Sequence, residues 1–323
     1  MAALAMAVFA SCSNEDELSQ SNYPADNVVR IMASMDGMDT RASYGNSTAK
    51  LSSFGFCINN ANSTTYTYDN VKVTKDDNNK WNPASQMLWQ NSTTPVDILA
   101  YAPYQESTED ASGKVTVFGK TDYAFSVKAD QSGAEDYLSD LIVYKQTGFT
   151  PGTQLNTSKA VDVAFTHLLS QLNLTIELRD QFNQDEKKPV TEATVTDVKV
   201  NGTIISSKVD FSASPISVQV VDTQEATAIT PETTEFKAAG KTTDHAAFNY
   251  SAIVIPQTVT AGNFSISFKV NGTDYIWTST SDVKFVSGNK HQLSLLVGKD
   301  VVQVKGITAT PWGEENITQG ETD

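Results

Sequence analysis

The side chains best suited to acid–base or metal chemistry are sparse in this sequence. It contains three histidines, His167, His245 and His291, and no two of them have the spacing of zinc ligands. His167 begins an apolar run, a position more typical of a hydrogen-bonded, half-buried side chain than of a catalytic base. The histidines therefore predict neither a metal centre nor a general base.

Acidic residues are more numerous, but they gather in segments typical of turns. Asp76-Asp77-Asn78-Asn79 resembles the start of a calcium loop, yet it lacks the glycine at position 6 and the glutamate at position 12 that such a loop needs. Adjacent acidic pairs in turns are usually solvated surface, and adjacency does not supply the separation that glycosidases use. We predict a turn at Asp76, and no metal, cofactor or catalytic carboxylates. The pairs are Glu109-Asp110, Glu135-Asp136, Asp185-Glu186 and Glu314-Glu315.

Nucleophile motifs are missing too, since there is no phosphate-binding glycine loop, Gly-x-Ser-x-Gly elbow or Cys-x-x-Cys pair. Tyrosines could stack on sugars, but on alternating strand positions they more often pack within or against a sheet. The sequence thus predicts a protein that is not an enzyme. The tyrosines concerned are Tyr66, Tyr68, Tyr101 and Tyr104.

The two cysteines, Cys12 and Cys57, have different surroundings. Cys12 follows eleven apolar or small residues, a run too short to span a bilayer as a helix and typical of a signal peptide. Phe9-Ala10-Ser11-Cys12 resembles a bacterial lipobox, so we expect acylation of Cys12. The leader lacks a basic segment, and we expect the translation start upstream of Met1 or a trimmed chain. Cys57 is expected to be a buried, inert thiol within a strand.

The composition favours a folded, strand-rich protein. Of 323 residues, 39% are hydrophobic and 19% charged, while Ser, Thr and Asn are abundant, which suits turns that bond to their own backbone. The formal net charge of −15 repels phosphate backbones, so nucleic-acid binding is excluded. Such a surface suits solubility in an envelope or extracellular setting.

Short apolar segments separated by Asn, Asp, Ser and Gly clusters indicate a β-sandwich or barrel. One or two helical turns are expected within 133–140, and no long helix. Asn201-Gly202 and Asn271-Gly272 each predict a tight hairpin. The expected strands are 28–35, 51–58, 66–73, 87–89, 96–102, 114–118, 123–127, 141–144, 161–165, 167–178, 291–297 and 301–310, with Trp312 ending the ordered part.

The length exceeds that of a usual single core, and a Gly-, Pro- and Ser/Thr-containing stretch at 146–160 marks a boundary. We predict a signal peptide with lipobox over 1–12 and a flexible tether over 13–27. Two all-β domains are expected to follow, over 28–155 and 156–323.

Several segments together resemble, in order, those of the fimbrillin family of Bacteroidetes, the subunits of type V pili. They are Met87-Leu88-Trp89 with Val96-Asp97-Ile98-Leu99-Ala100-Tyr101-Ala102-Pro103-Tyr104, then Val163–Leu172, and finally Ile307-Thr308-Ala309-Thr310-Pro311-Trp312-Gly313. Thr40-Arg41-Ala42 stands where the family carries a trypsin-like maturation site, and Ser13-Asn14-Glu15-Asp16-Glu17 resembles an acidic lipoprotein export signal.

This resemblance implies two tandem transthyretin-like β-sandwich domains and export as a lipoprotein to the surface of the outer membrane. It also implies cleavage between Arg41 and Ala42, which would remove the lipid anchor together with strand 28–35. The open sheet edge could then accept a strand from another subunit by β-augmentation, and head-to-tail filling would build a fimbrium. Expected partners are other fimbrial subunits, the outer membrane before cleavage, and a host or bacterial surface ligand.

The candidate donor strand is 301–310, and its register is left open by Gly306. The inserting side chains are either Val301, Ile307 and Ala309, or Val302 and Val304. For Arg41 the alternative is an ordinary loop arginine. For the whole chain the alternative is a monomeric, surface glycan-binding lipoprotein, which would share the leader, the acidity and the all-β fold.

Overall fold

The computed structural model describes residues 22–35, 48–106, 116–133, 135–182, 189–239 and 245–312. Nearly all regular structure in these ranges is β-strand, as predicted, and none of the helices there is long and apolar enough to cross a membrane. The helical elements are the single α-helical turn α1 (Pro151–Gln154) and the 3₁₀ turns η1 (Thr64–Tyr66), η2 (Asp136–Ser139), η3 (Asp180–Phe182) and η4 (Glu192–Thr194).

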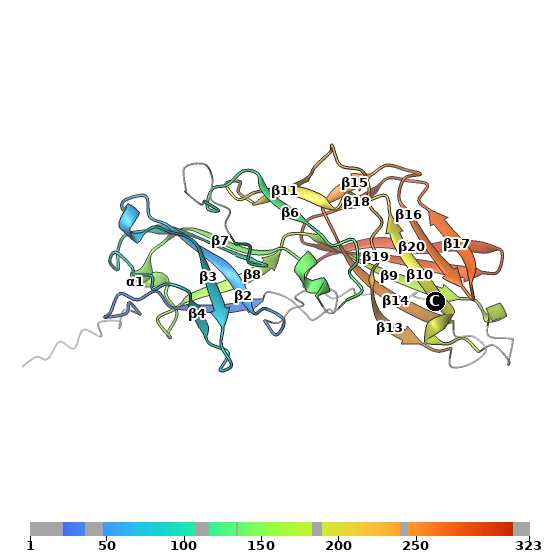
Figure 1. Ribbon diagram of the computed structural model, residues 1–323, viewed down its shortest axis with the longest axis horizontal. Helices are drawn as coiled ribbons and strands as arrows, with labels where there is room; N and C mark the ends of the chain where they lie inside the picture. Colours follow the sequence, from blue (N-terminus) through green and yellow to red (C-terminus); the bar gives the residue numbers. More distant parts are fainter. Residues whose placement is uncertain are drawn as a thin grey trace, which may run out of the picture.

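The molecule is elongated, and its sheets follow one another along the long axis (Figure 1). A seven-stranded sheet forms one end, with the strand order β1-β8-β7-β5-β2-β3-β4. All its pairings are antiparallel except that of β1 with β8. Its strands are β1 (Ile31–Met35), β8 (Val161–His167), β7 (Ile142–Phe149), β5 (Val96–Ala102), β2 (Ser53–Asn59), β3 (Tyr68–Lys75) and β4 (Trp81–Pro83).

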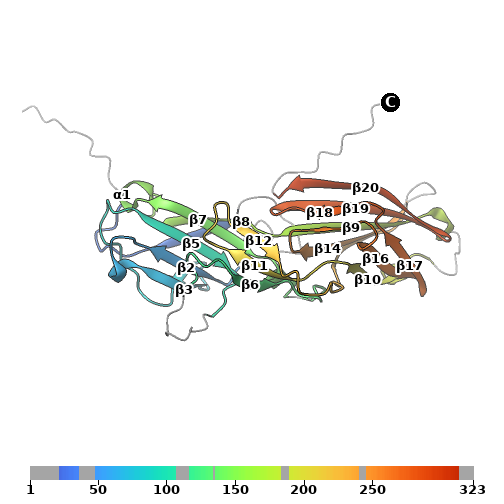
Figure 2. The ribbon, with the colours of Figure 1, turned by 90° about the horizontal axis from the view of Figure 1, so that it is seen from above.

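The other end is a sandwich built mainly from two sheets (Figure 2). Its larger sheet has the order β13-β14-β9-β19-β20, and the sheet β10-β16-β17 and the pair β15-β18 complete it. The strands of the larger sheet are β13 (Glu232–Lys237), β14 (Ala246–Val254), β9 (Ser170–Leu178), β19 (Asn289–Gly298) and β20 (Val301–Pro311). The others are β10 (Val195–Asn201), β16 (Ser265–Val270), β17 (Thr273–Thr278), β15 (Gln257–Val259) and β18 (Val283–Phe285).

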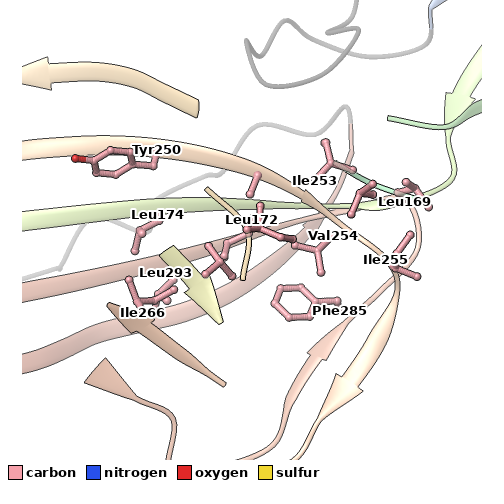
Figure 3. Close-up of a cluster of buried hydrophobic side chains, with 14 of the residues drawn as sticks. Leu169, Leu172, Leu174, Tyr250, Ile253, Val254, Ile255, Ile266, Phe285 and Leu293 are labelled. Atoms are coloured by element: carbon pink, nitrogen blue, oxygen red, sulfur yellow. The ribbon is translucent and has the colours of Figure 1, made fainter. Parts of the chain in front are cut away.

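A strict alternation of apolar and polar residues explains the core of this second sandwich. On β9, Leu172, Leu174 and Ile176 are buried, while the residues between them face outward. They pack with apolar residues of β14, β16 and β18, as Figure 3 shows for Tyr250, Ile266 and Phe285 among others. The inward residues of the two facing sheets thus pack together as a two-layer core.

A small third sheet joins the two ends of the molecule. It has the order β12-β11-β6, with β6 (Tyr123–Ser126) from the first half and β11 (Ser206–Asp210) and β12 (Ser217–Val220) from the second. Phe211, just after β11, contacts the rings of Tyr101 and Tyr123 at centroid distances of 5.8 and 5.1 Å. One continuous apolar cluster therefore runs from the inner face of the first sheet into the second sandwich.

The first sheet continues past the predicted boundary at residue 155, because β8 and its neighbour β7 are hydrogen-bonded within it. The C-terminal part of the predicted tether (13–27) also packs against this half, since Pro24 is buried and the Asn22 amide donates to the Leu155 carbonyl at 3.0 Å. We propose that the two halves divide after His167, and that 203–221 belongs by its packing to both.

The structure corrects several local predictions. Asn271-Gly272 does form the predicted hairpin, with φ of 49° and 82°, joining β16 to β17. Asn201-Gly202 does not, because β10 and β11 enter different sheets. Gly202 is needed there for a close approach, since a Cβ would lie 2.0 Å from the Asn263 carbonyl oxygen.

Two predicted strands are also absent from the described residues. In the 87–89 segment only Leu88 makes a bridge, to Val28, because the chain there crosses under the start of β1. Residues 116–118 are not a strand, because the backbone N–H groups of Val117 and Phe118 donate to the Asp69 carboxylate instead of to a neighbouring strand. The short 3₁₀ turn η2 agrees with the helical turn predicted in 133–140.

Candidate assembly site

Strand β1 lies at the edge of the first sheet, where β8 is its one neighbour among the strands that the structure describes. Its five residues pair in parallel with β8, from Ile31 opposite Val161 through to Met35. Ile31 and Ala33 point into the apolar cluster of this half, whereas Met32 points outward and is 46% exposed. Without β1, strand β8 would present a row of unpaired backbone N–H and C=O groups at the edge of the described sheet.

The residues just before β1 make further contacts with the 87–89 segment. Val28 bridges to Leu88, and the Val29 N–H donates to the Met87 carbonyl at 3.0 Å. A groove of about 750 Å³ runs between this segment and β4, with Trp81 among its lining residues. Loss of the first strand would join this groove to the apolar surface beneath it.

Strand β20 lies at the edge of the second sandwich, where among the described residues it pairs with β19 alone (Figure 2). Ile307 stands opposite Leu293, and Val304 stands opposite Leu295. Directly opposed residues share a face, and both leucines are buried, so Ile307 and Val304 face the core. They are nevertheless 44% and 47% exposed. The inward row of β20 is therefore only half covered in its own subunit.

A β-bulge sets which side chains of β20 share a face. The register moves by one residue, so that Lys305 has no opposite residue in β19. Val301 faces the outer side of the sheet. The bulge brings the remaining apolar residues of the strand onto the inward face, and these are Val302, Val304, Ile307 and Ala309.

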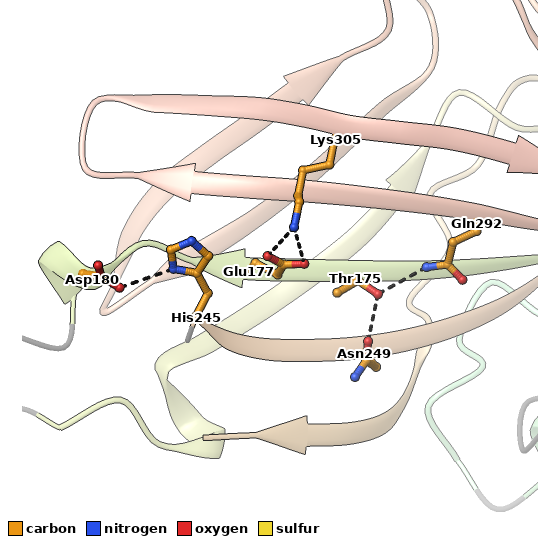
Figure 4. A network of polar contacts seen from close by, with 7 residues as sticks. All are labelled: Thr175, Glu177, Asp180, His245, Asn249, Gln292 and Lys305. Carbon is orange, nitrogen blue, oxygen red and sulfur yellow. Dashed lines mark hydrogen bonds and ion pairs between the residues drawn. The ribbon is translucent and has the colours of Figure 1, made fainter. Parts of the chain in front are cut away.

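The outer face of the same sheet is polar (Figure 4). Lys305 reaches across β19 to Glu177 on β9, with Nζ to carboxylate distances of 2.9 and 3.1 Å. The Thr175 hydroxyl donates to Asn249 at 2.8 Å and accepts from the Gln292 amide at 3.2 Å. Because these groups are partly solvated, the ion pair contributes little to holding β20 in place.

The last described residue ties the end of β20 to the other half of the molecule. The Trp312 ring stacks on His167 at the end of β8, with centroids 3.8 Å apart and planes at 9°. His167 Nδ1 is 2.8 Å from Asp140 Oδ2, and both side chains are almost fully buried. The backbone N–H of Trp312 donates to the Gly288 carbonyl at 2.7 Å. We call Trp312, His167 and Asp140 the C-terminal clasp.

The predicted site residues divide into two sets. Cys12, Arg41 and Ala42 lie outside the described residues, so acylation and cleavage stay predictions. The five donor-strand residues all lie on β20, and the bulge separates Val301 from the other four. Sequence reasoning assigned Trp312 only as the end of the ordered part and missed its stacking on His167. A lone aromatic residue beyond a strand was the available signal.

The other two histidines make hydrogen-bonding or ionic contacts that are structural. His245 lies at the surface with Nδ1 3.4 Å from Asp180. His291 is buried on β19, and burial lowers its pKa, so it accepts the Val286 N–H as a neutral side chain. No group of three His, Cys, Asp or Glu side chains among the described residues could hold a metal ion.

Cys57 and the Asp76 segment follow the sequence predictions. Cys57 is a free, buried thiol whose pKa is raised by burial, and it donates to Asp69 at 3.2 Å. The Asp76 carboxylate closes the turn between β3 and β4 by accepting the N–H groups of Asn78 and Lys80, both at 2.9 Å. The thiol is thus inert, and the acidic segment is a turn.

Comparisons with known proteins agree with this architecture. A protein from Bacteroides ovatus inferred to act in cell adhesion has a TM-score of 0.59 and 10% identity, covering 90% of this chain and 99% of its own. A protein from Bacteroides uniformis with the same inferred role has a TM-score of 0.52 and 21% identity, with the same coverage. A fimbrial protein from Bacteroides vulgatus has a TM-score of 0.52 and 15% identity, covering 88% and 99%. No curated protein matches the chain.

At these identities the solved structures establish the shared fold alone. The family match is independent of them, because a model described as fimbrillin-like matches residues 40–312, most of the chain. The match begins after β1, includes the other strands of both halves, and ends at the tryptophan of the clasp. The chain therefore belongs to the fimbrillin-like family, whose members are structural fimbrial and adhesion proteins rather than enzymes.

Proposed function

We propose that this chain is a subunit of a surface fimbrium, exported as a lipoprotein precursor through Cys12 and assembled head to tail by strand exchange. Cleavage between Arg41 and Ala42 releases the lipid anchor together with β1. Strand β20 of another copy then fills the vacated position. Each subunit both gives and accepts a strand, so the contact does not close on itself and a filament grows.

The observation that best supports this proposal is the mismatch between the two strands. The inward residues Val304 and Ile307 of β20 are nearly half exposed, whereas the cluster beneath β1 is fully apolar and buried. A strand that leaves the first environment for the second gains buried apolar area. The bond between subunits is then a continuous sheet, as in β-augmentation.

The glycan-binding alternative would call for an exposed aromatic platform. Tyr101, one of the tyrosines that the sequence offered, is fully buried, and its hydroxyl donates to Asn70 at 2.6 Å. Tyr104 lies beneath the Lys72 ammonium, 5.1 Å from ring centroid to nitrogen. Neither arrangement favours a flat, solvent-facing sugar site.

Limited trypsin digestion of the purified full chain tests the proposal. We expect an early cut between Arg41 and Ala42, identified by N-terminal sequencing, followed by filaments in negative-stain electron microscopy. The matched control is Arg41→Gln, which removes the cleavage site and should leave monomers after the same digestion. Monomers from the correctly cut native chain, accompanied by binding on a glycan array, would favour the alternative.

A further inference from the structure

Two strands far apart in the sequence carry the same series of apolar side chains on their inward faces. The first strand and the residues that lead into it present the series Val29, Ile31 and Ala33. Strand β20 presents the series Val304, Ile307 and Ala309. In both, the order is valine, isoleucine, alanine from the N-terminal to the C-terminal end.

The bulge makes the two series equal in spacing as well as in order. Val304 and Ile307 are three residues apart, but Lys305 is the extra residue of the bulge and occupies no inward position. Val304, Ile307 and Ala309 therefore stand at successive inward positions, as Val29, Ile31 and Ala33 do. Without the bulge, Lys305 would fall at the position of Val29, which is 3% exposed. Burying an unpaired ammonium there would be strongly unfavourable.

We infer that β20 of one copy, keeping its bulge at Lys305, replaces β1 of another in a single register. It runs parallel to the acceptor's β8, with Ile307 opposite Val161 and Ala309 opposite Val163. These are the positions that isoleucine and alanine of β1 hold in the closed subunit. The inference rests on the proposed function and adds the direction and alignment of the donated strand.

The competing register moves the strand along β8 and removes the bulge. It would place Val304 opposite Val161, Gly306 opposite Val163 and Thr308 opposite Phe165. The glycine leaves a void where β1 has an alanine, and the threonine brings a hydroxyl to the inward position of Met35. An unfilled apolar site loses its packing contacts, and a buried hydroxyl without a partner adds a further cost. The bulged register avoids both penalties.

Exposure supplies the driving force for the bulged register. Val304 and Ile307 are 47% and 44% exposed on their own subunit, while Val29 and Ile31 are 3% and 6% exposed at the positions to be filled. Each of the two side chains thus passes from a half-covered to a covered site. The pairing with β19 that is lost on release is replaced by pairing with β8, so the added burial of these two side chains favours the exchange.

Disulfide trapping at Ala164, on the outward face of β8, distinguishes the two registers. Ser34 of β1 stands opposite Ala164, so the inferred register places Thr310 opposite Ala164, whereas the competing register places Ile307 there. Directly opposed positions on neighbouring strands are about 4.8 Å apart, which suits a disulfide. Ala164 is exposed, so a cysteine there is accessible.

The experiment uses the full chain carrying either Thr310→Cys with Ala164→Cys, or Ile307→Cys with Ala164→Cys. Each variant is cut with trypsin, allowed to assemble, and oxidised. Non-reducing gels measure the covalent ladder, and the three single-cysteine variants and the native chain give the background. Cleavage at Arg41 removes Cys12, and Cys57 is buried, so the introduced thiols dominate the signal.

We expect a ladder from the Thr310 pair at least tenfold stronger than from the Ile307 pair. A ladder from the Ile307 pair instead, or filaments with neither ladder, would overturn the inferred register while leaving strand exchange in place. Failure of the cut native chain to form filaments at all would overturn the proposed function and the register together. The native-chain control therefore separates the two failures.

Discussion

The C-terminal clasp joins the two halves of the chain through one ring. Trp312 stacks on His167, which is itself fixed by the Asp140 carboxylate. Stacked aromatic pairs contribute on the order of 1 kcal/mol beyond the area that they bury. The stack therefore adds to the pairing with β19, which runs to Pro311, in holding the far end of β20.

At this scale we expect Trp312→Ala to loosen β20. Loss of the stack should cost about 1–2 kcal/mol of local stability, which corresponds to roughly a tenfold rise in amide exchange across 301–311. Hydrogen exchange followed by mass spectrometry measures it. Trp312→Phe keeps a ring on His167 and serves as the matched control. Unchanged exchange in the alanine variant would show that the clasp does not restrain the strand.

At the scale of single elements, β20 has two faces with separate tasks. Its inward face carries the apolar series and its outer face carries Lys305, paired with Glu177. The inward residues are half exposed in the closed subunit, so a polar substitution there is tolerated in the monomer better than in a core strand. The same substitution meets a fully apolar site after exchange.

We therefore expect Ile307→Asp to leave the monomer folded but to prevent assembly. An unpaired carboxylate would have to be buried against the apolar cluster of the acceptor. Thr310→Asp adds the same charge on the outer face, opposite Ala164 in the inferred register, and is the control that should assemble normally. Circular dichroism checks the fold, and light scattering after trypsin cleavage follows assembly. Equal assembly of the two variants would contradict the assigned faces.

Features of these elements that neighbouring residues determine could be predicted from the sequence, whereas features that depend on distant strands could not. The hairpin at Asn271-Gly272 was predictable, because both turn residues adopt positive φ and the flanking residues alternate. The bulge at Lys305 was not, since it is defined only by the register with β19. Gly202 carried the same turn signal as Gly272, but its role is set by the distant Asn263.

The same distinction between local and distant causes applies to the residues of the candidate site. The apolar residues of β20 were identified from their alternation, and β1 was identified as a strand. The partnership of Trp312 with His167 could not be read from the sequence, because it joins residues from different halves whose contact depends on how the sandwiches pack. Cys12 and Arg41 were identified from short motifs alone.

At the scale of the whole molecule, the third sheet fixes the two halves to each other. Lys145 on β7 donates to three successive carbonyls, those of Phe211, Ser212 and Ala213, at 2.8, 3.2 and 3.0 Å. Beneath it lies the apolar cluster that both halves share. The halves are thus packed against each other through a shared sheet and a shared apolar cluster.

We expect Lys145→Met to weaken this joint by about 1–3 kcal/mol, because hydrogen bonds from a charged donor are lost while the methylene stem is kept. Scanning calorimetry should then show a broader transition with a lower ratio of van't Hoff to calorimetric enthalpy. Lys208→Met removes an exposed lysine from β11 and should change neither quantity. A sharp, unshifted transition for Lys145→Met would mean that the halves are coupled by the apolar contacts alone.

The β12-β11-β6 sheet has a mechanical consequence in any filament of such subunits. A pull on the fibre would enter a subunit at the strand accepted beside β8 and leave at the strand it donates, at the opposite end. Because residues 203–221 return from the second half to clamp the first, that load crosses the waist of the subunit by shearing hydrogen bonds side by side. The load is therefore not taken up by extension of a flexible linker between the two halves. The fibre would therefore stretch stiffly, and its weakest point would lie between subunits rather than within them.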